Sequence, residues 1–306
     1  MNRVTHEVAV PMEVPRAEVE TGPSALSDFM VLTKARLSLL VIVTTFVGFC
    51  MASGARLDWL LLFHAVAGTT MAACAAAVLN QFMEANVDRL MERTRHRPLP
   101  AGRMKSGHAL ALGLGLAVAG VAWLWFTANA MSAYLAAATI LIYIALYTPL
   151  KRRTSLCTIV GAVAGAIPPV IGWAVVHPSL DLGAWVLFGI LFTWQMPHFL
   201  AIAWMYRDEY AQAGFVMLPS DDISGCATAL QSLLYTIGLT GITLVPFFVG
   251  LNSAIYLAGA VLLDAVMIVC AVQFLMQRTR PSARRLFFAS ILFLPLVLGL
   301  MVFTKA

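Results

Sequence analysis

Long apolar segments alternate with short polar connections along most of this chain. Nine such segments can be marked, at roughly 35–53, 59–83, 108–127, 131–148, 156–176, 184–206, 227–249, 253–276 and 285–303. Each is close to the ~20 residues that a helix needs to cross the hydrocarbon core of a bilayer. The pattern predicts an all-α polytopic membrane protein with nine transmembrane helices.

The connections differ in charge, and the difference predicts an orientation. If nine spans are assumed, 18 of the 20 Lys and Arg residues fall on one side, and only Arg56 and Lys305 fall on the other. Basic residues gather in cytoplasmic loops. We therefore expect the N-terminus in the cytoplasm and the C-terminus outside, in the periplasm of a bacterium.

A coarse internal repeat is visible in the order of these segments. The second and the sixth apolar segments both end in an acidic motif that leads into a long cytoplasmic connection. Two four-helix halves plus one extra helix would explain this order. The acidic helix ends would then face each other across one cytoplasm-facing cavity.

Composition supports a membrane class and a single domain. Of 306 residues, 60% are hydrophobic and only 11% are charged. A soluble protein carries about twice that charged fraction. The net charge of +5 is explained by basic loops at a membrane, so we expect no nucleic-acid partner. Residues 1–27 hold prolines and glutamates without an apolar core, which predicts a disordered cytoplasmic tail before a transmembrane domain at 28–306.

The end of the second apolar segment carries the clearest candidate chemistry. Asn80, Glu84 and Asp88 are four residues apart, and on a helix such steps place side chains in one column. Two carboxylates and an amide beside several arginines suit a hard cation and a phosphorylated ligand. The alternative is a polar helix end that water solvates at the membrane surface.

A second polar cluster lies in and after the sixth apolar segment. Gln195 and His198 flank Pro197 and share a helix face, and Asp208 and Glu209 follow near the cytoplasmic surface. His198 is either hydrogen-bonded to a neighbouring helix or a substrate contact, a proton acceptor or a ligand to a metal such as haem iron. Asp208 and Glu209 are either loop charges or a second set of carboxylates.

Basic residues near these acids complete the candidate site. Mg²⁺ is commonly held by one or two carboxylates together with phosphate oxygens and water. Two acidic clusters on facing helices would hold such ions against a diphosphate. The remaining negative charge would be neutralised by Arg93, Arg97, Lys151 and Arg152.

Three further features of the apolar segments stand apart from this site. Asp264 lies in the middle of the eighth segment, where an acid is either functional or bonded to a neighbouring helix. The segment 165–172 contains Pro168 and Pro169 between two glycines, which predicts a broken helix with close backbone approach. His64 has no partner that the sequence identifies.

The first motif resembles the signature of the UbiA-type intramembrane prenyltransferases along its whole length. Its pattern is Asn80-x3-Glu84-x2-Val87-Asp88-x2-Met91-x-Arg93-Thr94-x2-Arg97-x4-Gly102. Four further stretches are similar to the branch of that family that acts on haem: 147–152, 165–169, 194–199, and 206–210 leading to 217–219. Together the motifs span roughly residues 33–220, whereas the last three helices match only in pattern.

The resemblance implies a nine-helix bundle and a Mg²⁺-dependent transfer reaction. Farnesyl diphosphate would bind through metal to Asn80, Glu84, Asp88 and the second acidic cluster. A vinyl group of haem b would attack the allylic cation, and water would complete a hydroxyethylfarnesyl side chain. The expected partners are therefore farnesyl diphosphate, haem b, membrane lipid and a downstream haem A synthase. The family often has Asp where this chain has Glu84 and Glu209.

Two other functions fit parts of the pattern. One is prenyl transfer to a different acceptor, such as an aromatic acid or a chlorophyll-like ring, against which the segment 194–199 argues. The other is a transporter or haem-delivery protein, although transporters usually place polar sites near the bilayer midplane. Because the tail contains four glutamates, it does not resemble an organellar presequence, and we expect a bacterial inner membrane.

Overall fold

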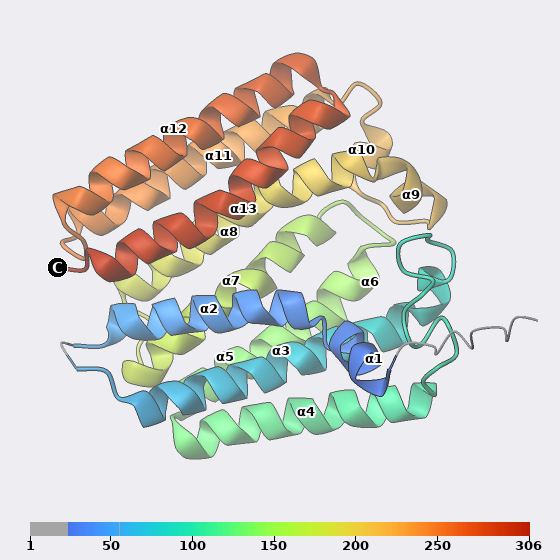
Figure 1. Cartoon of the computed structure of the whole chain (residues 1–306), viewed down its shortest axis with the longest axis horizontal. Helices are drawn as coiled ribbons and strands as arrows, with labels where there is room; N and C mark the ends of the chain where they lie inside the picture. The colour runs from blue at the N-terminus through green and yellow to red at the C-terminus, as the bar shows by residue number, and fades with distance from the viewer. Residues whose placement is uncertain (1–23, 55) are drawn as a thin grey trace, which may run out of the picture.

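The computed structural model of the chain describes residues 24–54 and 56–306 (Figure 1). Most of the predicted tail, residues 1–23, lies outside the described residues, and the first helix begins at Ala25. The helices are α1 (Ala25–Leu32), α2 (Ala35–Ala52), α3 (Trp59–Asp88), α4 (Ser106–Thr127), α5 (Ala130–Leu141), the π-helix η1 (Ile142–Tyr147), α6 (Thr148–Leu150), α7 (Cys157–Val176), α8 (Leu182–Met205), α9 (Arg207–Gln212), α10 (Leu218–Asp221), α11 (Cys226–Phe248), α12 (Ala254–Gln277) and α13 (Arg280–Phe303).

The all-helical prediction is confirmed. Among the described residues, eight helices are long and apolar enough to cross a membrane, with α5, η1 and α6 forming one of them. A ninth span is obtained if α1 and α2, which are bent by 56° relative to each other, are counted as one. Helix α3 continues to Asp88, so the entire acidic motif is helical.

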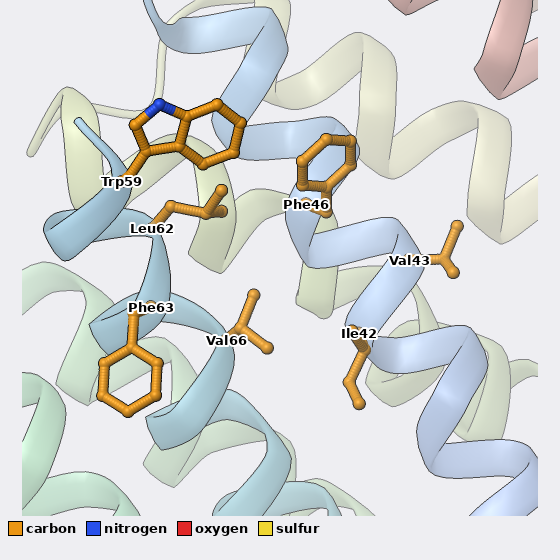
Figure 2. A pocket seen from close by; sticks show the side chains of 7 residues that line it. All are labelled: Ile42, Val43, Phe46, Trp59, Leu62, Phe63 and Val66. Carbon is orange, nitrogen blue, oxygen red and sulfur yellow. The ribbon is translucent and has the colours of Figure 1, made fainter. Parts of the chain in front are cut away.

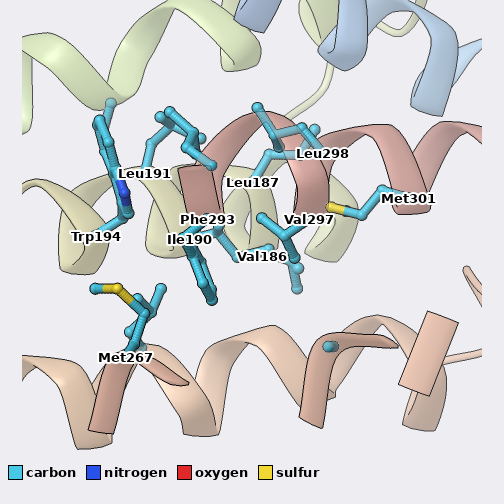
Figure 3. Packing of buried hydrophobic residues seen from close by; sticks show 14 of the residues in the cluster. Val186, Leu187, Ile190, Leu191, Trp194, Met267, Phe293, Val297, Leu298 and Met301 are labelled. Carbon is cyan, nitrogen blue, oxygen red and sulfur yellow. The ribbon is translucent and has the colours of Figure 1, made fainter. Parts of the chain in front are cut away.

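The helices pack as one bundle in which two apolar clusters meet. One cluster joins α8, α12 and α13, with residues of α2, α7 and α11 (Figure 3). Figure 3 shows side chains of α8, α12 and α13 pointing toward one another, among them Ile190, Trp194, Met267, Phe293 and Val297. The other cluster joins α2, α3, α4, α5 and α7. Because α2 and α7 contribute to both clusters, they connect the two parts of the bundle.

Glycines allow α2 and α7 to approach closely. A methyl group at Gly48 of α2 would collide with the carbonyl oxygen of Pro169, and one at Gly172 of α7 would collide with that of Thr45. Close approach at 165–172 is therefore confirmed. The predicted break is wrong, because α7 runs unbroken through Pro168 and Pro169. Nearly every residue from Ala162 to Val175 is buried, and packing on this scale keeps the helix continuous where its sequence alone favours interruption.

One end of the bundle carries the polar connections. In Figure 1 the loop between α3 and α4, helices α6, α9 and α10, and the turn from α12 to α13 lie at the right, opposite the C-terminus. The C-terminal Lys305 instead caps α2 at the other end, where its ammonium donates to the carbonyl oxygens of Cys50 and Ser53. The basic connections that the charge pattern grouped together therefore share one end of the bundle.

The contact between α2 and α7 yields a stability prediction. We expect Gly48→Ala to lower stability by ~1–3 kcal/mol, because the added methyl group forces two packed backbones apart. Gly115→Ala on α4 is the matched control, since nothing lies within 4 Å of the added atom there. Thermal unfolding of the detergent-solubilised protein measures both. An equal midpoint for the two variants would contradict the close-packing argument.

Candidate functional site

The end of α3 places three polar side chains on a buried face. Asn80, Glu84 and Asp88 are 0%, 7% and 2% exposed. The alternative of a helix end solvated by water does not fit this burial. Carboxylates are costly to bury unless they are paired and hydrogen-bonded. The surroundings of α3 must therefore supply positive charge at this point.

A charged cavity of about 270 Å³ lies against this face. It contains the carboxylates of Glu84 and Asp88, and its basic lining residues are Lys34, Arg93, Arg97 and Lys151. The remaining lining residues are Leu37, Met91, Thr94, Tyr143, Tyr147, Tyr210, Phe215 and Met217. Four cations thus face two carboxylates, so the charged cavity has an excess of positive charge that suits an anionic ligand.

Each carboxylate is paired with one of these cations. The Lys151 ammonium donates to both oxygens of Glu84, at 2.8 and 3.1 Å. The Arg97 guanidinium donates to Asp88 at 2.7 Å. Burial alone would lower the pKa of Lys151, but Tyr147 and Glu84 beside it outweigh burial and hold that pKa above its usual value. These neighbours therefore favour the charged form of Lys151.

A hydrogen-bonded network connects Asn80 to two other parts of the chain. The Lys34 ammonium donates to the side-chain oxygen of Asn80 at 3.0 Å and to the hydroxyl of Tyr143 at 3.4 Å. The amide nitrogen of Asn80 donates to the Thr148 hydroxyl at 3.1 Å. Asn80 thus fixes the positions of a cation from the start of α2 and of the turn that contains α6.

The π-helix η1 forms an aromatic wall of the charged cavity. Tyr143 and Tyr147 lie four residues apart on it, with ring centroids 4.9 Å apart. The Lys151 ammonium lies 4.5 Å from the centroid of Tyr147 and 5.7 Å from that of Phe215. The electron-rich faces of these rings favour a nearby cation. A π-helical turn inside a helix is frequently found at functional sites.

The second acidic cluster and Arg152 lie outside this lining. Asp208 is exposed and pairs with Arg280 at 2.6 Å. Glu209 keeps one buried carboxylate oxygen that has no hydrogen-bond partner. Arg152 is exposed, whereas Arg93, Arg97 and Lys151 all line the charged cavity. The structure therefore brings together only part of the predicted site.

The donors present fit a hard cation that is shared with a phosphorylated ligand. Among the described residues, no three His, Cys, Asp or Glu side chains are grouped so that the protein alone could hold a metal ion. Mg²⁺ does not need such a cage, because it is commonly bound by one or two carboxylates, phosphate oxygens and water. Glu84 and Asp88 provide two carboxylates beside a positively charged lining. The unpartnered oxygen of Glu209 is a further hard donor near the end of α8.

Gln195 and His198 point into contacts between helices. The Gln195 amide donates to the carbonyl oxygens of Ala162 and Leu191, and Gly165 leaves room for it against α7. A ring nitrogen of His198 lies 2.8 Å from the Ser290 hydroxyl of α13. The His198 ring is stacked on Trp194, with centroids 5.0 Å apart. Neither residue lines the charged cavity.

The two isolated polar residues of the apolar segments also face neighbouring helices. Asp264 of α12 lies 2.6 Å from the Thr243 hydroxyl of α11, which confirms the interhelical hydrogen bond considered for it. His64 packs against Trp123, with ring centroids 5.5 Å apart. Its Nδ1 is buried without a hydrogen-bond partner.

An apolar groove lies elsewhere on α2 and α3. Figure 2 shows that its lining residues come from both helices and that Trp59 lies at the start of α3. The seven lining residues are Ile42, Val43, Phe46, Trp59, Leu62, Phe63 and Val66. None of them lines the charged cavity. The groove is therefore a separate feature of the same helix pair.

Several cavity residues were not identified as site residues from the sequence. The lining residues Lys34, Tyr143, Tyr210 and Phe215 are not among the site residues predicted from the sequence. Tyr147 and Tyr210 lie within stretches that carry the family resemblance, so a signal for both was present. Lys34 and Tyr143 carry no local signal, because only the packing of α2 against α3 and η1 brings them to Asn80.

Comparisons with known proteins place this architecture among prenyltransferases. Residues 41–294 match the model of the UbiA prenyltransferase family. The chain is 42% identical over 289 residues to a protoheme IX farnesyltransferase of Solibacter usitatus, covering 92% of this chain and 99% of the relative. It is 38% identical to a mitochondrial protoheme IX farnesyltransferase of Arabidopsis thaliana, covering 88% of this chain and 62% of the relative.

Solved structures share the fold at low sequence identity. A structure of digeranylgeranylglyceryl phosphate synthase superposes with a TM-score of 0.78 at 15% identity, covering 91% of this chain and 98% of the other. A UbiA homologue from Archaeoglobus fulgidus, bound to GPP and Mg²⁺, superposes with a TM-score of 0.65 at 11% identity, covering 90% and 99%. These similarities support the all-helical architecture.

The pairing of Lys151 with Glu84 yields a second prediction. Lys151→Met should lower stability by ~3–5 kcal/mol, because it leaves the Glu84 carboxylate buried without its partner. The double variant Lys151→Met/Glu84→Gln should recover much of that loss, since the uncompensated charge is removed. The measurement is thermal unfolding of the wild type, the two single variants Lys151→Met and Glu84→Gln, and the double variant. Additive losses in the double variant would show that the two side chains do not act as a pair.

Proposed function

The chain belongs to the UbiA prenyltransferase family, and we propose that it transfers a farnesyl group from farnesyl diphosphate to a vinyl group of haem b, with addition of water. The products are haem O and diphosphate. The relatives named protoheme IX farnesyltransferase, at 35–42% identity over most of the chain, support this acceptor.

The observation that carries the proposal is the excess of cations in the charged cavity at one end of an apolar bundle. Four basic side chains face two carboxylates there, although each charge is costly to remove from water. A diphosphate at the head of an apolar chain matches both parts of this environment. Its charged end fits the cavity, and its prenyl tail is soluble among apolar helices.

The first step is cleavage of the allylic carbon–oxygen bond. The electron pair of that bond leaves with the diphosphate, and a farnesyl cation remains. Arg93, Arg97 and Lys151 lie where they would stabilise the negative charge that grows on the departing oxygen. We include two further cations in this set. Lys34 lines the charged cavity, and Arg152 is an exposed neighbour of Lys151.

Metal binding would rearrange the ion pairs of the charged cavity. Asn80, Glu84 and Asp88, together with Asp208 and Glu209 of the second cluster, would hold Mg²⁺, which supplies neutralising charge to the diphosphate. Glu84 and Asp88 are paired with Lys151 and Arg97 in the structure. On ligand binding, the two carboxylates would turn toward metal while the two cations turn toward phosphate oxygens.

The second step forms the new carbon–carbon bond. The π electrons of a haem vinyl group attack the farnesyl cation, and the positive charge moves to the carbon next to the porphyrin ring. Water adds to that carbon and loses a proton, which leaves the hydroxyethylfarnesyl group. The apolar bundle limits the access of water to the first cation, so that the vinyl group reacts before water does.

The haem would lie near the middle of α8. Gln195 and His198 are the candidate contacts, because they are the polar side chains of the stretch 194–199. In the structure His198 is engaged with Ser290 and stacked on Trp194, so haem binding would require its ring to leave or share these contacts.

The apolar helices identify an integral membrane protein, and its surroundings follow from the proposed chemistry. We place it in a bacterial inner membrane with the basic end of the bundle in the cytoplasm. The cytoplasm supplies the water-soluble diphosphate end of the donor. A haem A synthase would consume the product, and membrane lipid surrounds the spans.

The decisive test is the haem content of cells that express the protein. We expect a new haem species that is heavier than haem b by a farnesyl group plus water, resolved by chromatography and mass. Asp88→Asn should lower its formation by about a hundredfold or more, because the variant loses one of the carboxylates that would hold Mg²⁺ against the diphosphate. Glu92→Gln is the matched control, since Glu92 is exposed and pairs with Arg95 outside the charged cavity.

Unmodified haem b alone, with folded protein and farnesyl diphosphate present, would exclude haem as the acceptor. Prenylation of an aromatic acid or a chlorophyll-like ring in the same membranes would then identify a different member of the family. Removal of Mg²⁺ by EDTA should abolish either transfer, and added Mg²⁺ should restore it.

The role proposed for His198 has its own test. If His198 contacts haem, His198→Ala should weaken haem b binding, measured by titration of the Soret absorbance in purified protein. Ser290→Ala removes the hydrogen-bond partner of His198 but leaves the imidazole in place. Equal haem affinity in wild type and His198→Ala would show that His198 serves only the contact between α8 and α13.

A further inference from the structure

We propose that Gln81 is a positioning residue for Lys34. Its hydrogen bonds to the carbonyl oxygens of Val31 and Leu32 at the end of α1, a contact that we call the clasp, hold Lys34 in the charged cavity. Lys34 binds the diphosphate there. The inference rests on the proposed function. Gln81 follows Asn80 in the acidic motif but points to a different element. Its side chain is 0% exposed and does not line the charged cavity.

Gln81 satisfies the carbonyl groups that end α1. Its amide nitrogen donates to the carbonyl oxygen of Val31 at 2.9 Å and to that of Leu32 at 2.8 Å. The last carbonyls of a helix have no partner within the helix, so an outside donor stabilises the end where it lies. Gln81 has two amide hydrogens, and both are used here.

The orientation of this amide is fixed by chemistry. If the amide were reversed, its oxygen would face two carbonyl oxygens, and no hydrogen bond would form. In the observed orientation the Gln81 oxygen is buried without a partner. An unpaired buried acceptor costs free energy. The two hydrogen bonds that Gln81 donates must therefore offset the cost of burying its unpaired oxygen.

The clasped segment leads directly into an unusual backbone conformation. Lys34 has φ of 50° and ψ of 52°, which lie in the left-handed region of backbone conformation that residues other than glycine seldom adopt. The turn is stabilised on both sides of Lys34. Its own N–H donates to the Val31 carbonyl at 3.2 Å, and the Ser38 hydroxyl donates to the Thr33 carbonyl at 3.0 Å.

This conformation turns the Lys34 side chain toward the charged cavity. There its ammonium bonds Asn80 at 3.0 Å and Tyr143 at 3.4 Å. Strained backbone persists where the surrounding contacts enforce it, and it is often found at binding sites. Without the clasp, the turn would relax toward ordinary helix, and the ammonium would leave Asn80.

A second contact restrains α1 nearer its start. Arg103, in the loop that follows the acidic motif, donates to both oxygens of Asp28, with its shortest bond at 2.7 Å. Helix α1 is thus held near its start by Asp28 and at its end by Gln81. Because both tethers come from the acidic motif and its loop, the position of Lys34 depends on the same segment that supplies Glu84 and Asp88.

The experiment compares Gln81→Met, Lys34→Met and the double variant with the wild type, using the full chain in detergent. Met matches Gln in size but donates no hydrogen bond. Gln231→Met on α11 is the control, because Gln231 is exposed. The first measurement is the rate of trypsin cleavage after Lys34, identified by the mass of the fragments. The second is the KM for farnesyl diphosphate with haem b, together with the Kd for inorganic diphosphate in the presence of Mg²⁺.

We expect Gln81→Met to speed trypsin cleavage after Lys34. It should also raise the KM for farnesyl diphosphate and the Kd for inorganic diphosphate by about tenfold, since the charge-assisted hydrogen bond from Lys34 to the diphosphate is lost. The change in kcat should be smaller. In the Lys34→Met background, Gln81→Met should have no further effect on KM or Kd, because it acts through Lys34. A residue that only stabilises the bundle would lower the unfolding temperature without this dependence on Lys34.

Two results would overturn the inference. An active wild type with unchanged cleavage, KM and Kd in Gln81→Met would exclude the clasp and leave the proposed function intact. Additive effects of Gln81→Met and Lys34→Met on KM would show that Gln81 does not act through Lys34. A wild type that neither binds inorganic diphosphate nor turns over farnesyl diphosphate would instead remove the proposed function, and the role of Lys34 with it.

Discussion

The buried carboxylates of Glu84 and Asp88 set the main constraint on this structure. A carboxylate that is removed from water must be paired, or its pKa shifts until it becomes neutral. Lys151 arrives from the end of one span and Arg97 from the loop after α3, and each pairs with one carboxylate. The end of α3 with its following loop and the segment that carries Lys151, which are distant in sequence, are thereby brought to one place.

The same arrangement provides more positive charge than the carboxylates need. Lys34 and Arg93 also line the charged cavity but make no ion pair with Glu84 or Asp88. The surplus is what allows an anionic ligand to bind without leaving buried charges uncompensated. Exchange of partners, with cations moving to phosphate and carboxylates moving to metal, would conserve charge balance within the cavity. A site of this kind is stable before the ligand arrives and is suited to a ligand of high charge.

Close helix packing keeps this polar end rigid. Gly48 and Gly172 let the backbones of α2 and α7 touch, and α2 carries Lys34 at its start. Core interiors are packed as densely as crystals, so a helix held in this way has little freedom to move. The clasp of Gln81 and the contact of Arg103 extend that rigidity to α1. The geometry of the charged cavity therefore depends on apolar contacts far from it as well as on its own ion pairs.

The helices, their approximate ends and the core of the site follow from the order of residues alone, because each depends on local pattern. Hydrophobic segments of spanning length predict helices wherever they occur, and the spacing of Asn80, Glu84 and Asp88 places them on one helix face regardless of the fold. Which other groups join them depends on how the helices pack in three dimensions. This packing brought Lys34 and Tyr143 to Asn80, left Asp208 and Arg152 outside the cavity lining, and kept α7 unbroken through two prolines. These outcomes depend on contacts between helices that are distant in sequence, and no local pattern encodes such contacts.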